Sequence, residues 1–185
     1  MPLLTATEIR AARGRLSAAD FPGTIRSHFP YWDVQYRPYL LLAVDALPRE
    51  RFDWKPRPEM MTAHQMIVHI AEAECGWIDH VVDGALEQEW IVPAADPADG
   101  WKCVVDAPDH ARLFALLEKW HQPTQRWLER PVAELARVLT RVLPDGTTRS
   151  YTLHWILDHV QEHEIHHRAQ LNTYLRLMGF EPPSI

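Results

Sequence analysis

The spacing of apolar residues is the feature that most constrains the fold of this chain. Four long segments repeat their apolar side chains every three or four residues, as amphipathic helices do, and no segment alternates convincingly as a strand would. The expected helices cover residues 31–46, 62–82, 107–129 and 152–178. Helices of this kind bury their apolar stripes most simply against one another. The sequence therefore predicts an all-α fold, a four-helix bundle.

Capping residues and turn residues add detail between these segments. Residues 5–8 and 62–65 read T-x-x-E and T-x-x-Q, which predicts a short N-terminal helix and marks the start of the second long helix. Residues 84–108 lose the helical period, so we expect a long loop there, of the kind that is often a functional flap. Residues 144–146, Pro-Asp-Gly, predict a turn, within either a small hairpin or a plain loop.

Length and composition exclude several classes of protein. A single domain over residues 1–185 is the simplest organisation for a chain of this length. The formal net charge is −6 and no dense block of lysine and arginine is present, so we expect no nucleic-acid partner. The longest apolar run, residues 39–44, is too short to cross a membrane, and the N-terminus lacks the apolar stretch of an export signal. With two cysteines and no C-x-x-C motif, we expect a cytoplasmic protein without disulfides.

Histidine is the residue type that indicates chemistry. The chain has eleven histidines, and five of them lie in the last expected helix. His163 and His167 are four residues apart, so their rings share one helix face and can bind one ion together. On a helical wheel these two fall with the apolar stripe, whereas His159 and His166 fall at its edge. We therefore expect His163 and His167 to face the bundle interior, either as metal ligands or as core histidines bonded to Glu, Tyr or water.

A third metal ligand should come from a facing helix, because two histidines do not hold an ion firmly. His69 is the candidate, since it lies on the apolar face of the second long helix. His64 points away from that face, and His80 lies about 16 Å farther along the helix axis. Three imidazoles with a fourth position open to water are typical of a catalytic rather than a structural metal site.

The run from His163 to His167 also matches H-E-x-x-H, the signature of zinc peptidases. A peptidase is not expected, because the motif lies near the C-terminus, lacks the extension with a further histidine, and follows no strands that would bind a peptide. Glu164 is the candidate catalytic residue, as a general base or as a hydrogen-bond partner of the ligands. Most glutamates at a helix edge are nevertheless simply solvated.

Two parts of the chain resemble the DinB/YfiT-like superfamily. The run from Tyr151 to Leu171, with the residues up to Pro183, is similar to the closing segment of that superfamily. The earlier motifs that resemble it are Leu47-Pro48, Trp54-Lys55-Pro56 and the stretch from Thr62 to Glu74. The resemblance covers most of the chain from about Tyr31 onward.

The resemblance implies a four-helix bundle in up-down-down-up order and a divalent metal, often zinc or nickel, bound by three histidines. The corresponding positions in this chain are His69, His163 and His167. Characterised relatives include thiol S-transferases that use bacillithiol or mycothiol and a mycothiol-dependent maleylpyruvate isomerase, and homodimers are common among them. Ala169 stands where the iron-binding, ergothioneine-type branch has a glutamate, so that branch is not matched.

These features together predict a metal-dependent transferase that holds a low-molecular-weight thiol as thiolate against a small electrophilic substrate. Trp54, Trp77, Trp90 and Trp101 are candidates to close over the electrophile, although packing explains each of them more readily. Two alternatives stay open: a non-catalytic metal-binding bundle with a stress or scaffold role, and a hydrolase or isomerase that uses the same ion as a Lewis acid. The expected partners are small molecules and, by the resemblance, a second copy of the chain.

Overall fold

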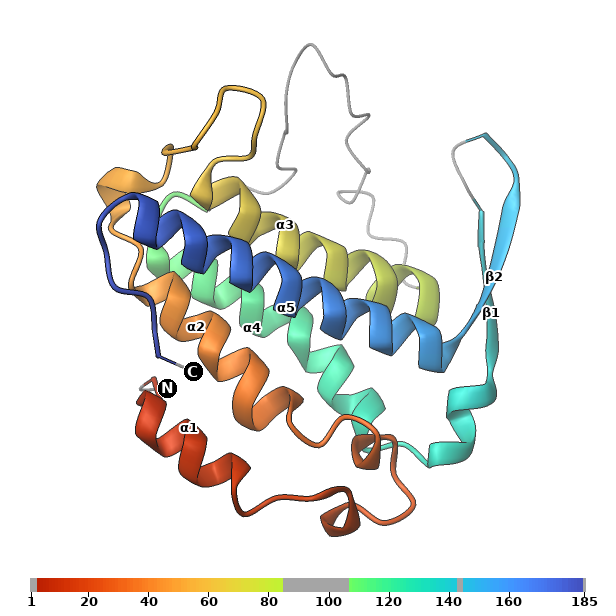
Figure 1. Ribbon diagram of the computed structural model, residues 1–185. Coiled ribbons are helices and arrows are strands. Elements are labelled where there is room, and N and C mark those ends of the chain that lie inside the picture. The colour runs from red at the N-terminus through yellow and green to blue at the C-terminus, as the bar shows by residue number, and fades with distance from the viewer. Residues whose placement is uncertain (1–2, 85–106, 143–144, 185) are drawn as a thin grey trace.

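The computed structural model describes residues 3–84, 107–142 and 145–184, most of which are helical. The α-helices of these residues are α1 (Ala6–Arg13), α2 (Arg37–Asp45), α3 (Ala63–Cys75), α4 (His110–Leu128) and α5 (Leu153–Leu177). Figure 1 shows α2 to α5 side by side, with α3 and α4 starting at one end and α2 and α5 at the other. No described helix has both the length and the hydropathy needed to cross a membrane.

Two of the predicted long helices contain a π-helical segment that their apolar period did not predict. These segments cover Trp32–Tyr36, directly before α2, and Gly76–Val82, directly after α3. Pro38 stands in the first turn of α2, directly after the π-helical segment Trp32–Tyr36. The predicted helix over 31–46 therefore changes its hydrogen-bond pattern just before this proline.

The short N-terminal helix and the possible hairpin on either side of residues 144–146 have counterparts among the described residues. Thr5 caps α1 in a reciprocal capping box with Glu8, as predicted. On either side of the turn lie strands β1 (Val138–Val142) and β2 (Thr148–Thr152), which pair antiparallel. The all-α prediction is thus incomplete, because these residues, rich in β-branched side chains, form the hairpin that was one of the two alternatives.

The buried apolar side chains form two clusters at different levels of the helices. One cluster is shared by α2, α3, α4 and the end of α5, and it includes Leu40, Ile67 and Leu117. The other lies around the start of α5 and the hairpin, and it includes Trp32 and Ile156. The buried charged side chains come from the helical turns between these two levels.

We define the polar layer between the two clusters as Asp33, Arg37, Glu74, His121 and Glu164. Nη2 of Arg37 donates a hydrogen bond to Glu74 of α3 and lies 2.9 Å from Oε2 of Glu164 in α5. His121 of α4 lies 2.7 Å from Glu74 through Nδ1 and 2.7 Å from Asp33 through Nε2. Burial opposes a charge on His121, but these two carboxylates outweigh it and raise the pKa of His121. The polar layer therefore joins all four main helices.

Replacing Arg37 with methionine should lower the free energy of unfolding by about 3–5 kcal/mol, because Glu74 and Glu164 would stay buried without their cation. Urea denaturation measures this change. Arg57→Met is the matched control, since the exposed ion pair of Arg57 with Glu59 contributes at most about 1 kcal/mol. Equal stability of the wild type and Arg37→Met would show that the polar layer does not hold the helices together.

Candidate metal centre

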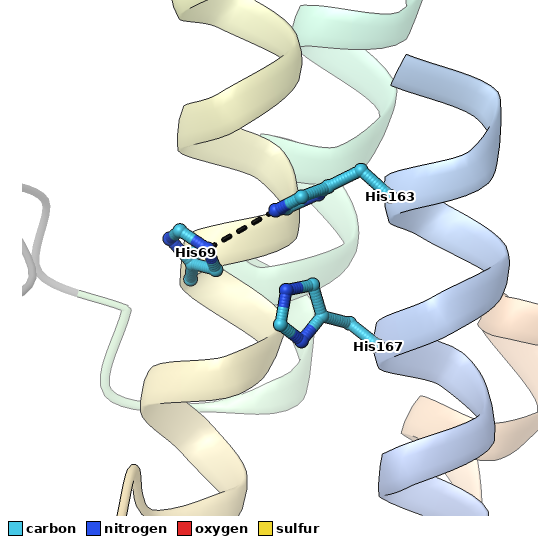
Figure 2. Close-up of side chains that lie close together, drawn as sticks. All are labelled: His69, His163 and His167. Carbon is cyan, nitrogen blue, oxygen red and sulfur yellow. Dashed lines mark hydrogen bonds between the residues drawn. The ribbon is translucent and has the colours of Figure 1, made fainter. Parts of the chain in front are cut away.

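Three histidines from two helices converge on one point. His69 lies in the middle of α3, and His163 and His167 lie one turn apart in the middle of α5 (Figure 2). One ring nitrogen from each lies within 4.8 Å of the other two, and the Nε2 atoms of His69 and His163 are 3.1 Å apart. All three side chains are half-buried. Over the described parts of the chain, no other group of histidine, cysteine or carboxylate side chains comes together in this way.

The spacing of the three rings suits a tetrahedral ion. With metal–nitrogen bonds of about 2.0–2.1 Å, tetrahedral geometry separates two ligand nitrogens by about 3.3 Å. The Nε2 atoms of His69 and His163 are already near this separation, and no separation in the group exceeds 4.8 Å. Small ring rotations therefore suffice to complete the site. Three protein ligands leave a fourth position for water or a substrate atom.

A neighbouring amide selects the ligand atom of His167. Nδ1 of His167 lies 2.8 Å from Oε1 of Gln170, and the Gln170 amide nitrogen lies 3.0 Å from Nε2 of His166. Because an amide oxygen only accepts, Nδ1 of His167 carries the proton, and the lone pair on Nε2 is free for a metal ion. No contact between Gln170 and the ligands was predicted from the sequence. Its position three residues after His167, on the same face of α5, was the available indication.

Burial keeps these histidines in the neutral form that binds metals. Burial first, and then repulsion from neighbouring histidines, lowers the pKa of His69 to about 4 and that of His163 to about 3. Burial also lowers the pKa of His167. The rings are therefore neutral at pH 7, and a divalent ion displaces no proton from them when it binds.

A comparison with protein families assigns the chain. The sequence model of the DinB family matches residues 26–185. The chain belongs to the DinB family. The resemblance noted in the sequence is thereby confirmed.

Solved structures of DinB-like proteins have the same fold. One from Bacillus subtilis is 22% identical, covers 87% of this chain and 95% of its own, and superposes with a TM-score of 0.58. One from Bacillus cereus is 16% identical, covers 88% of this chain and 98% of its own, and has a TM-score of 0.63. At such identities the likeness extends to the fold alone. Among curated proteins, no sequence matches the chain.

Within this DinB fold, the three histidines selected by the helical wheels are the three that come together. His64, which the wheel directed away from the site, lies with its Nε2 2.6 Å from the carbonyl oxygen of Ala107. His166 is exposed on the outer face of α5. His69 and His163 are 94 positions apart in the sequence, and they come together because α3 and α5 pack against each other.

His163 and His167 are less buried than the helical wheel predicted. Glu164 and Arg168 occupy more buried positions on α5, with exposed fractions of 2% and 6%. The two histidines instead lie half-buried at the edge of α5 that faces α3. Glu164, which the sequence left as a candidate base, a partner of the ligands or a solvated residue, is buried against Arg37.

Glu164, the predicted catalytic residue, lies in the polar layer. Its Oε2 is 2.9 Å from Nη2 of Arg37 and accepts a hydrogen bond of 3.3 Å from Nε1 of Trp32. Burial raises the pKa of Glu164. The side chain is therefore not solvated, as most glutamates at a helix edge are, and its contacts are those of a residue that fixes α5.

Part of the predicted flap falls outside the described residues. That part is residues 85–106, which include Trp90, Trp101 and Cys103. Of the other tryptophans proposed to close over an electrophile, Trp54 packs against Tyr174 with ring centres 5.3 Å apart. Trp77 lies beside aromatic rings of α5.

The neutral histidines predict that the metal-free protein loses stability in mildly acidic solution. The pKa of an unfolded histidine is about 6.5, above the values of His69 and His163 in the folded state. Between about pH 6.5 and 4 the unfolded chain binds more protons, so the free energy of unfolding falls as the pH is lowered, by at most about 1.4 kcal/mol per pH unit for each histidine.

Urea denaturation of the metal-free protein between about pH 7 and 4.5 measures this slope. His163→Gln should reduce the slope, because the variant has one buried histidine fewer to protonate on unfolding. His154→Gln, which removes an exposed histidine of the same helix nine residues before His163, should leave the slope unchanged. A slope that is the same in His163→Gln and the wild type would contradict the assignment of neutral, buried rings.

Gln170→Leu should weaken metal binding by about 10- to 100-fold, because Nδ1 of His167 would lose the acceptor that fixes its proton and ring orientation. Competition with a chromophoric chelator measures the affinity. Thr173→Ala, an exposed change on the same helix, is the control and should bind metal as the wild type does. Unchanged affinity in Gln170→Leu would mean that the ring needs no such partner.

Proposed function

We propose that this DinB-family protein is a metal-dependent transferase. His69, His163 and His167 would hold a divalent ion, zinc or nickel, and its open position would take a low-molecular-weight thiol of the bacillithiol type. A small electrophile would then receive the thiol. The observation that carries the proposal is the group of three ligand nitrogens within 4.8 Å of one another, which leaves one coordination position free.

A divalent ion, when bound, lowers the pKa of a coordinated thiol so that thiolate forms at neutral pH. The protein's own residues hold the ligands and the helices that carry them in place. Gln170 holds the tautomer of His167, and Arg37 ties the helix of His69 to the helix of His163. We assign Glu164 to this fixed layer rather than to a role as general base, because its carboxylate is bonded to Arg37 and Trp32.

The resemblance supports a thiol cosubstrate, since the S-transferases and the isomerase among the characterised relatives use bacillithiol or mycothiol. We also infer that the four main helices form the up-down-down-up bundle of the family. In that order the second and fourth helices are neighbours, which agrees with the packing of α3 against α5. The ligands then come from two rigid elements and not from a loop.

The test of the metal site is elemental analysis of untagged protein purified without chelator. We expect about one equivalent of a transition metal in the wild type. His69→Ala, His163→Ala and His167→Ala should each lose it, whereas His64→Ala and His166→Ala should keep it. No metal in the wild type, even after incubation with zinc or nickel, would overturn the proposal.

The test of thiol chemistry is the visible spectrum of the cobalt-substituted protein. Addition of bacillithiol should produce a sulfur-to-cobalt charge-transfer band, because the fourth position is open to thiolate. Transfer of the thiol to monochlorobimane, in which the new sulfur–carbon bond displaces chloride, is then followed by fluorescence. A cobalt spectrum that no thiol perturbs would favour the non-catalytic bundle, or a hydrolase or isomerase that uses the ion as a Lewis acid.

A further inference from the structure

A row of aromatic rings continues from the three histidines along α5. Tyr151, Trp155 and His159 stack with ring centres 4.5 and 4.9 Å apart and are nearly parallel, at 24° and 11°. The ring of His159 lies 6.2 Å from that of His163, one of the proposed metal ligands. Trp155, His159 and His163 are spaced by four on one face of α5, and Tyr151, in β2 just before the helix, extends the row.

Trp77 stands against the side of this row. Its ring centre is 5.2–5.5 Å from those of Tyr151, Trp155 and His159, and its plane is 70–86° from theirs. Trp77 follows His69 by eight residues on the helix that carries the third ligand. It lies in the π-helical segment Gly76–Val82, and such segments often occur at functional sites. We call Tyr151, Trp155, His159 and Trp77 the aromatic ladder.

Part of the aromatic ladder is open to solvent. Trp155 is 43% exposed, and His159 and Trp77 are half-buried. A row of partly exposed aromatic rings next to the proposed metal site offers a small molecule both an apolar wall and a polar anchor. The rings stack too closely for a guest to enter between them, so a ligand would lie against the exposed sides of Trp155 and His159.

A cation lies on the aromatic ladder at the hairpin side. Cζ of Arg141, in β1, is 4.9 Å from the centre of the Trp77 ring. Within the described part of the chain, Arg141 has no carboxylate partner. A guanidinium in this position can pair with a carboxylate or another anionic group of a bound molecule.

We propose that the aromatic ladder binds a planar aromatic part of the substrate, with an anionic substituent directed to Arg141. The reactive atom of that substrate would lie beside the thiol held at the open metal position, next to His163. This inference rests on the proposed metal site and names its substrate class, an aromatic electrophile that carries a negative charge. Trp155 and Trp77 determine specificity for the ring, and Arg141 determines specificity for the charge.

Two hydroxamates that differ only in their tails test the proposal on the cobalt-loaded protein. Acetohydroxamate has the metal-binding head alone, and 2-naphthohydroxamate adds a flat aromatic tail. We expect the naphthyl compound to bind at least about tenfold more tightly. Trp155→Ala and Trp77→Leu should each remove most of this advantage. The advantage should stay in Trp127→Leu, which alters a tryptophan of α4 whose Nε1 bonds to Asp83.

The outcomes separate the aromatic ladder from the metal site. Acetohydroxamate binding without any naphthyl advantage, or an advantage that survives both ladder variants, would overturn the ladder proposal while the metal site stands. If no cobalt binds, the proposed function fails, and the ladder is tested alone by quenching of tryptophan fluorescence with 2-naphthoate. Quenching that is lost in Trp155→Ala and weakened in Arg141→Ala would support the ladder, and absence of quenching would overturn it.

Discussion

One buried guanidinium joins the two helices that carry the candidate metal ligands. Arg37 contacts Glu74 of α3 and Glu164 of α5 at once. Hydrophobic burial, which supplies most of the driving force for packing these helices, has no preferred direction. A charge-assisted contact in a low-dielectric interior is favourable in one arrangement only. The distance between α3 and α5, and with it the separation of the histidine rings, therefore depends on this side chain.

Adjacent residues of α5 have different roles, one in the candidate metal site and one in the protein interior. His163 points toward α3, and Glu164, the next residue, is bonded in the polar layer. Because neighbouring residues on a helix are about 100° apart, one turn of α5 can direct His163 toward α3 and bury Glu164 in the polar layer. A shift of α5 along its axis would break the anchor before it moved the ligand far. The precision of the site thus comes from the interior of the protein.

Local patterns predicted the helices and the three histidines, because both depend on residues close in sequence. Helical period, capping boxes and the four-residue spacing of His163 and His167 are properties of a single segment. The polar layer could not be predicted, since Arg37 finds its partners only when three helices are packed. The unpredicted contact of Arg37 with Glu164 also explains why the helical wheel predicted deeper burial for the two histidines. Without Arg37, the burial of Glu164 would be unfavourable. The π-helical segments were missed because one extra residue per turn changes no local composition.

The π-helical segment after α3 has a consequence for how relatives of this chain can differ. A π-helical turn amounts to an α-helix with one residue inserted, so the residues beyond it are rotated by about 100° relative to an uninterrupted helix. His69 lies before the segment Gly76–Val82, and Trp77 lies within it. Deletion of one residue there would turn a different side chain toward α5 beyond Cys75 and leave the histidine in place. Substrate preference could then diverge by a change of length, with no substitution among the metal ligands.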